Sequence, residues 1–158
     1  MAGQTILDQN APDQIHLTVA TVVEKDGTYL CVSEYDNGKL VYNQPAGHVE
    51  PGEELTAAAR RETLEETGWH VELTGFMGIT TYKAPGNGVT YYRVCFAGKA
   101  KRFDPDYVLD ADIEEAVWLS YEELLERREL MRSPLVLQAL ENYRDNRVYS
   151  LSLATLSE

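Results

Sequence analysis

The chain has 158 residues, of which 14 are basic and 26 acidic, so its formal charge is −12. This length suits a single domain, and a hydrophobic content of 44% is enough to form a full core. The acidic balance argues against electrostatic binding to nucleic acid or to anionic membranes, and no apolar run is long enough to cross a bilayer. We therefore expect a cytoplasmic protein without a nucleic-acid or membrane partner.

The chain is expected to begin with a polar leader over residues 1–13, followed by one domain over residues 14–158. The leader lacks the basic and apolar regions of a signal peptide. β-Branched residues dominate positions 15–23, which predicts a buried strand. An Asp-Gly turn then predicts a hairpin with a second strand over residues 28–34, and an Asp-Asn-Gly turn introduces a short strand over residues 40–42.

A loop punctuated by Pro and Gly follows, and it leads into a helix expected over residues 54–67, with Gly68 in the left-handed position that ends it. The later elements are three strands and two helices. We place them at residues 71–82, 89–96, 113–119 and 121–130, with the last helix beginning at Ser133-Pro134. Strands interrupted by one helix and followed by others predict an α+β fold, an α/β/α sandwich in which helices flank a mixed sheet.

Three glutamates of the expected central helix share one face, because Glu65 and Glu66 lie within about 60° of Glu62 around the helix axis. Most such clusters are solvated surfaces. Here, however, Glu62 and Glu66 repel one another at i,i+4, and Glu65 and Glu66 lie in the last turn, where the helix dipole disfavours negative charge. A bound Mg²⁺ or Mn²⁺ would relieve this conflict through oxygen ligands. Ala57 and Leu64 lie on the opposite face, so the periodicity alone leaves both interpretations open.

Other types of site find less support. The three histidines, His16, His48 and His70, show no ligand spacing for zinc, and each is interpreted as an ordinary strand or loop residue. The two cysteines, Cys31 and Cys95, lie in strand-like segments and are expected to be reduced members of the core. The sequence contains no nucleophile elbow, P-loop or dinucleotide-binding motif.

The helix and the loop before it resemble the Nudix box. Gly47 is followed after five residues by Glu53, and after seven more by the run Arg61–Trp69 (RETLEETGW). The family pattern is Gly-x5-Glu-x7-Arg-Glu-U-x-Glu-Glu-x-Gly-U, in which U is a bulky apolar residue. Every charged and glycine position of this pattern is matched. Thr63 is the departure, since the family usually has an aliphatic residue there, but it removes no catalytic group.

The resemblance implies a Nudix fold and the hydrolysis of a phosphate ester or anhydride linked to a diphosphate. It also implies a divalent metal cofactor, which is Mg²⁺ or, as an alternative, Mn²⁺. The metal ligands implied by the match are Glu62, Glu65, Glu66 and the backbone carbonyl of Ala46. Glu53 and Arg61 match family residues that shape the loop and orient the carboxylates.

Members of the family often add a glutamate from outside the box as a further ligand or base. The candidates are Glu114 and Glu115, and Glu115, three residues before Trp118, is the better placed. Either Glu66 or Glu115 is expected to take the proton of the attacking water or to position that water. The catalytic set implied by the resemblance is Glu53, Arg61, Glu65, Glu66 and Glu115.

Residues outside the box are expected to bind the substrate. Asn43 and Gln44 directly precede it and are candidates for contacts with the non-phosphate part. Lys83 is a candidate because it begins a plausible recognition loop between two expected strands. Tyr91 is a candidate for stacking on a heterocyclic ring of the substrate. Arg93 is a candidate for neutralising a phosphate. Ordinary core packing of the tyrosine and a plain surface charge at the arginine are the competing interpretations.

Two softer motifs, at residues 43–48 and 130–136, resemble a phosphatase branch of the family. That resemblance implies a small diphosphate-containing substrate, such as a nucleoside tri- or diphosphate, hydroxymethylpyrimidine pyrophosphate or thiamine pyrophosphate, with release of orthophosphate. The alternatives are pyrophosphate release from nucleoside triphosphates, cleavage of a nucleotide sugar or dinucleotide, and a Nudix-like sensor that binds a nucleotide without turnover. The intact acidic set argues against the sensor, and the net charge argues against an RNA-cap hydrolase. A monomer or homodimer is expected.

Overall fold

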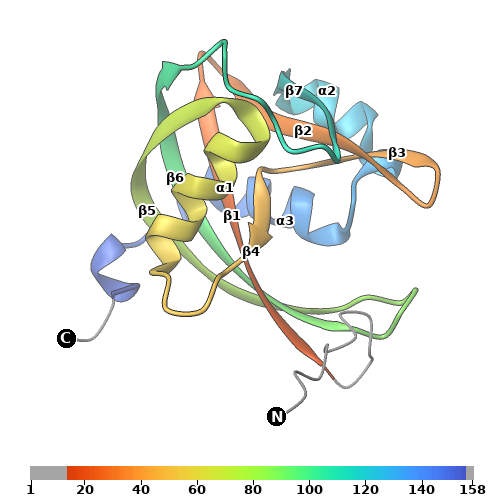
Figure 1. The fold of residues 1–158 in the computed structure, drawn as a ribbon, viewed down its shortest axis with the longest axis horizontal. Helices are drawn as coiled ribbons and strands as arrows, with labels where there is room; N and C mark the ends of the chain where they lie inside the picture. The colour runs from red at the N-terminus through yellow and green to blue at the C-terminus, as the bar shows by residue number, and fades with distance from the viewer. Residues whose placement is uncertain (1–13, 156–158) are drawn as a thin grey trace, which may run out of the picture.

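The computed structural model describes residues 14–155 and shows a mixed sheet with helices on both faces (Figure 1). Within this range seven strands pair in the order β3-β2-β1-β6-β5, while β4 pairs with β1 and β7 with β2. The strands are β1 (Ile15–Lys25), β2 (Thr28–Asp36), β3 (Lys39–Asn43), β4 (Ala46–His48), β5 (Trp69–Lys83), β6 (Thr90–Phe103) and β7 (Ile113–Ser120). The helices are α1 (Leu55–Thr67), α2 (Tyr121–Glu126) and α3 (Pro134–Arg144), with short 3-10 turns η1 (Arg128–Leu130) and η2 (Leu151–Leu153).

The turns follow the local signals in the sequence. Asp26 and Gly27 have φ of 50° and 76°, and Asn37 and Gly38 have φ of 50° and 79°. Two successive left-handed residues give a tight turn whose twist matches that of the flanking strands, so both hairpin predictions are confirmed. Gly68 ends α1 with φ of 74°, as predicted.

Two hydrophobic cores lie on opposite faces of the sheet, because successive side chains of β1 and β6 alternate between them. Val19 and Val94 belong to the core that α1 covers, whereas Ala20 and Cys95 belong to the core under α2 and α3 (Figure 1). Cys31 shares the second core, and neither cysteine forms a disulfide. The predicted α/β/α sandwich is therefore confirmed.

Three elements differ from the sequence-based prediction by more than two residues. The strand predicted over residues 89–96 continues to Phe103, because it pairs with β5 along its whole length. The loop predicted before α1 contains β4, which pairs with residues 18–20 of β1. The helix predicted over residues 121–130 ends as α2 at Glu126 and is followed by η1.

The predicted leader over residues 1–13 lies outside the described residues. None of the helices in residues 14–155 combines the length and the apolar character that a membrane crossing requires.

Candidate active site

The acidic face of α1 points into the protein. Its buried residues include Ala58, Ala59 and Thr63 together with Glu62 and Glu66, and each of these two glutamates is only 9% exposed. A solvated acidic surface is therefore excluded for Glu62 and Glu66. Thr63 is fully buried, and its hydroxyl donates a hydrogen bond to the carbonyl of Ala59 at 2.7 Å, so the departure from the family pattern leaves no unsatisfied polar group.

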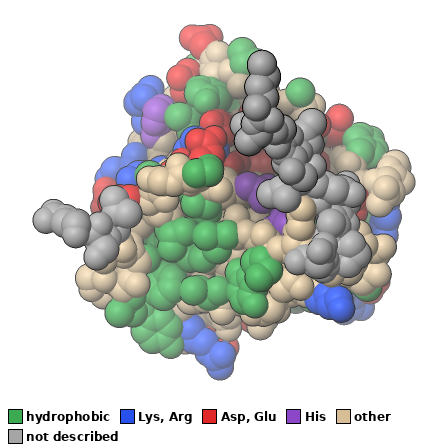
Figure 2. All heavy atoms as spheres, turned by 60° about the horizontal axis from the view of Figure 1, so that its bottom comes forward, with side chains coloured by type: hydrophobic (Ala, Val, Ile, Leu, Met, Phe, Trp, Pro, Cys, Tyr) green, Lys and Arg blue, Asp and Glu red, His purple; other side chains and the backbone are tan. Residues whose placement is uncertain are grey.

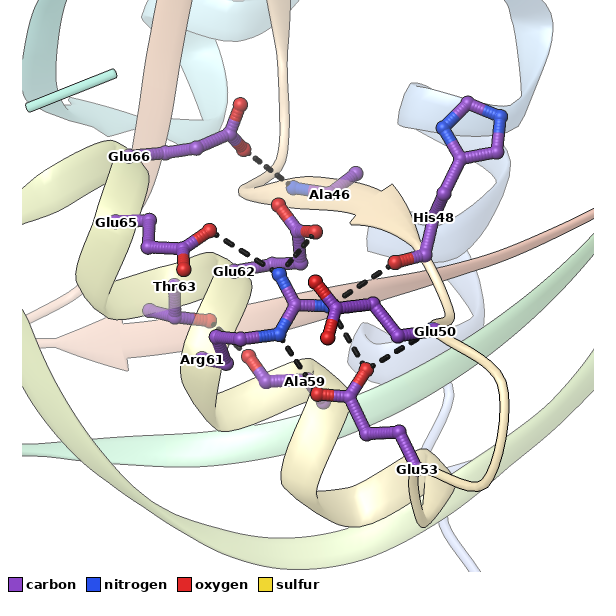
Figure 3. Close-up of polar contacts among 10 residues, drawn as sticks. All are labelled: Ala46, His48, Glu50, Glu53, Ala59, Arg61, Glu62, Thr63, Glu65 and Glu66. Atoms are coloured by element: carbon purple, nitrogen blue, oxygen red, sulfur yellow. Dashed lines mark hydrogen bonds and ion pairs between the residues drawn. The ribbon is translucent and has the colours of Figure 1, made fainter.

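Arg61 organises the carboxylates around it (Figure 3). Its Nε and Nη2 donate to the two carboxylate oxygens of Glu53 at 2.7 and 2.8 Å, a bidentate pair. Its Nη1 donates to Glu62 at 2.7 Å and to Glu65 at 3.1 Å, and its Nη2 also reaches the carbonyl of His48 at 3.0 Å. The hydrogen bonds from Arg61 lower the pKa of Glu53. This arrangement fits the supporting roles expected of Glu53 and Arg61.

Glu66 is not bound by Arg61, and its carboxylate is held by the backbone amide of Ala46. The N–H of Ala46 donates to Glu66 Oε1 at 2.7 Å. Burial raises the pKa of Glu66 to about 8, against the lowering effect of this hydrogen bond, and the carboxylates of Glu62, Glu34 and Asp110 raise it further. This contact uses the amide of Ala46, and the carbonyl that was expected to bind a metal takes no part in it.

Gly47 allows α1 to approach β4 closely. A Cβ at this position would lie 2.1 Å from the carboxyl carbon of Glu62, well inside van der Waals contact. This position of the Nudix box therefore requires glycine, because the Glu62 carboxylate occupies the volume that any larger side chain would need.

Asp110, from the loop between β6 and β7, lies close to two of the helix carboxylates. Carboxylate oxygens of Glu62, Glu65 and Asp110 all lie within 4.8 Å of one another. The backbone supports this placement, since the N–H of Asp110 donates to the carbonyl of Glu65 at 3.0 Å. Burial raises the pKa of Glu62 as well, so the site disfavours uncompensated negative charge. A convergent, oxygen-only donor set of this kind fits a hard divalent cation.

Asp110 could not be singled out from the sequence, because it is one of several aspartates between β6 and β7 and belongs to no motif. The expected additional acids lie elsewhere. Glu114 and Glu115 are exposed on β7, and Glu115 pairs with Ser33 of β2. Neither belongs to the carboxylate cluster found among residues 14–155.

This placement predicts different results for Asp110→Asn and Glu115→Gln. We expect Asp110→Asn to weaken Mg²⁺ or Mn²⁺ binding by about 10-fold or more, and Glu115→Gln to change it by less than about 2-fold. Isothermal titration with Mg²⁺, or spin-resonance titration with Mn²⁺, measures both affinities without substrate. A larger loss of metal affinity in Glu115→Gln than in Asp110→Asn would show that Glu115, and not Asp110, is the additional metal ligand.

The residues expected to bind substrate fall into two groups. Arg93 is buried on β6, and its Nη2 donates to Asn43 Oδ1 at 3.0 Å and to Gln44 Oε1 at 2.9 Å. Lys83 and Tyr91 lie apart from this network, Lys83 exposed at the end of β5 and Tyr91 half-buried on β6.

Two histidines, for which the sequence predicted no contact, form a hydrogen bond beside the site. His16 Nδ1 and His48 Nε2 share a hydrogen bond at 2.8 Å, and the Tyr91 ring lies 5.2 Å from that of His16. Figure 2 shows histidine side chains (purple) next to a recess in which acidic side chains (red) are visible. The pair depends on the β1–β4 pairing across 32 positions, which no local pattern reveals.

The buried carboxyl of Glu66 predicts a pH-dependent stability in metal-free protein. Its folded pKa of about 8 lies above the ordinary value of 4.5, so the native state holds a proton that the unfolded state releases. Stability should then fall as pH rises through this window, and Glu66→Gln should escape the fall. Thermal melting in EDTA should show the variant more stable than wild type at about pH 9 and similar at about pH 5. An equal difference at both pH values would contradict the prediction.

Comparison with known proteins identifies the family of this chain. The sequence profile of the NUDIX domain matches residues 14–140. The chain therefore belongs to the Nudix family and is a hydrolase. Members of this family generally use a divalent metal and act on small diphosphate-containing substrates.

The chain is 39% identical to phosphatase NudJ of Escherichia coli K12 over 138 residues, which cover 87% of this chain and 89% of that protein. A NUDIX hydrolase structure from Nitrosomonas europaea superimposes with a TM-score of 0.88 at 40% identity, over 91% of this chain and 98% of that one. A second NUDIX hydrolase structure from the same organism reaches 0.64 at 24% identity, over 84% and 71% of the two chains. The predicted similarity to a phosphatase branch of the family is confirmed, and the phosphatase is NudJ.

Proposed function

We propose that this hydrolase is a Mg²⁺-dependent phosphatase of nucleoside tri- and diphosphates that releases orthophosphate. The observation that carries the proposal is the convergence of Glu62, Glu65 and Asp110 beside the buried carboxyl of Glu66. A protein of charge −12 repels a diphosphate. A divalent cation held by these carboxylates would offset that repulsion and allow the diphosphate to bind. The similarity to a phosphatase supports orthophosphate as the product.

The residues that would hold Mg²⁺ are Glu62, Glu65, Glu66 and Asp110, with the Ala46 carbonyl as a further candidate. When bound, the metal neutralises charge on the phosphates and lowers the pKa of an attacking water. Arg61 fixes the carboxylates of Glu62 and Glu65 through its Nη1, so these oxygens are oriented before substrate arrives.

One carboxylate is needed to accept the proton of the attacking water. Of the two expected proton acceptors, Glu66 is buried and interacts electrostatically with Glu62 and Asp110 of the cluster, whereas Glu115 is exposed on β7. We therefore assign the positioning and deprotonation of the water to Glu66. The Ala46 N–H keeps one oxygen of Glu66 in place, which leaves the second oxygen to act on the water.

The substrate range follows from the resemblance to the phosphatase branch. We include hydroxymethylpyrimidine pyrophosphate and thiamine pyrophosphate beside the nucleotides, with Tyr91 and Lys83 as candidate contacts for the non-phosphate part and the phosphates. The fold does not choose among these leaving groups, because sites on one fold accept many substrates.

A product assay tests the proposal. Purified protein with Mg²⁺ is given a nucleoside triphosphate, a diphosphate, thiamine pyrophosphate, a nucleotide sugar and a dinucleoside polyphosphate, and phosphorus NMR separates orthophosphate from pyrophosphate. We expect orthophosphate from the tri- and diphosphates. Pyrophosphate as the product, or turnover of only the sugar or dinucleoside compound, would overturn the proposal within the family. Tight nucleotide binding without turnover would point to a sensor.

A further inference from the structure

The segment of residues 43–46, which joins β3 to β4 and leads into Gly47, is held by hydrogen bonds to distant parts of the chain. At its first half, Asn43 and Gln44 both accept hydrogen bonds from Nη2 of Arg93, at 3.0 and 2.9 Å. Gln44 in turn donates from Nε2 to the carbonyl of Val136 in α3 at 2.7 Å. Both ends of the Gln44 side chain are thus engaged in the interior, where it is 5% exposed.

The second half of the segment reaches the active site directly. The carbonyl of Pro45 accepts from the N–H of Thr21 on β1 at 3.1 Å. The next residue, Ala46, donates its N–H to Glu66 at 2.7 Å. Only two residues therefore separate the Gln44 side chain, held by Arg93, from the carboxylate to which we assign the attacking water.

Arg93 is an unusual residue to bury. It is 5% exposed, its two side-chain hydrogen-bond acceptors are neutral amides, and its Nε has no partner among residues 14–155. Removing a guanidinium from water without a paired carboxylate is costly, so this position is under a constraint other than packing.

The cavity that Arg93 lines is too small for a phosphate. This cavity, also lined by Thr80, Gln138 and Asn142 among others, has a volume of about 10 Å³. That is room for about one water molecule, which could satisfy Nε, and far too little for a phosphate group.

We propose that Arg93 is a positioning residue for hydrolysis, which holds Asn43 and Gln44 so that the N–H of Ala46 stays aimed at Glu66. This inference rests on the proposed function for its catalytic consequence. It replaces the expectation that Arg93 neutralises a substrate phosphate and that Gln44 contacts the substrate.

The test compares Arg93→Met with Gln44→Met, each of which removes a hydrogen bond between Arg93 and the segment. Displacement of a catalytic group by about 1 Å lowers turnover by about 10²-fold, so we expect kcat to fall by 10-fold to about 100-fold while KM changes by less than about 2-fold. Because both variants disturb one network, the double variant should lose little more than Arg93→Met alone. Arg102→Met is the matched control, since Arg102 lies on the same strand and pairs with His70 instead.

A second readout needs neither metal nor substrate. Hydrogen exchange of the Ala46 amide, followed by NMR in metal-free protein, should accelerate at least about 10-fold in Arg93→Met and Gln44→Met, with the amides of β5 unchanged. Should Arg93→Met fail to fold, Gln44→Met carries the same test. An increased KM with kcat retained, or unchanged Ala46 exchange in the folded variants, would overturn the inference. Absent turnover in wild type together with accelerated exchange would instead fault only the proposed function.

Discussion

Replacement of Glu66 by Gln is expected to lower kcat/KM by about 10²-fold or more, the scale seen when one preorganised electrostatic contact is lost. Glutamine has the shape of glutamate and can still accept the hydrogen bond from Ala46, so the fold is retained. What disappears is the negative charge that a metal and the attacking water would use. Glu65→Gln should show a loss of similar size, because Glu65 contributes an oxygen to the carboxylate cluster.

The matched control is Glu126→Gln, an identical chemical change at an exposed position of α2. Steady-state kinetics at saturating Mg²⁺ compare the three variants, and circular dichroism verifies that each is folded. Near-wild-type turnover in both Glu65→Gln and Glu66→Gln would exclude the assignment of these carboxylates to the metal site.

Gly47→Ala is the second substitution with a large expected effect. The new methyl group would lie 2.1 Å from the Glu62 carboxyl carbon, so this carboxylate must move away from the cluster it shares with Glu65 and Asp110. We expect metal affinity to fall by about 10-fold or more and turnover by about 10²-fold. The fold should survive, because the atoms displaced belong to the end of a flexible side chain and not to the backbone.

Gly86→Ala provides the comparison for Gly47→Ala. An added Cβ at Gly86 meets no atom within 4 Å, so activity and Mg²⁺ affinity should match those of wild type. Calorimetric titration of the metal into both variants measures the difference. Equal Mg²⁺ affinities for Gly47→Ala and wild type would show that the Glu62 carboxylate does not depend on the space above Gly47.

The features predicted well from the sequence are those encoded by neighbouring residues. The spacing of Glu62, Glu65 and Glu66 determines their shared face on any helix, and Asn37-Gly38 encodes its turn without reference to the rest of the chain. The burial of Glu62 and Glu66 was left undecided by periodicity, because it depends on what α1 packs against.

The features that were missed depend on contacts between distant segments. Asp110 reaches the cluster through a backbone hydrogen bond to Glu65, and His16 meets His48 through the pairing of β1 with β4. For Arg93 the sequence left two interpretations open, a contact with a phosphate and a surface charge, and its burial excludes the second. Its burial behind β3 and α3 follows from the register of β6 in the sheet, which no local pattern specifies.

Removal and restoration of metal test the central claim most directly. Orthophosphate release from a nucleoside diphosphate is measured with Mg²⁺, after exhaustive chelation, and after Mg²⁺ is added back, in wild type and in Glu66→Gln. The carboxylate cluster predicts activity that is abolished by the chelator and restored by Mg²⁺ in wild type, and that stays low in the variant throughout. Orthophosphate release that persists undiminished after chelation would contradict the account.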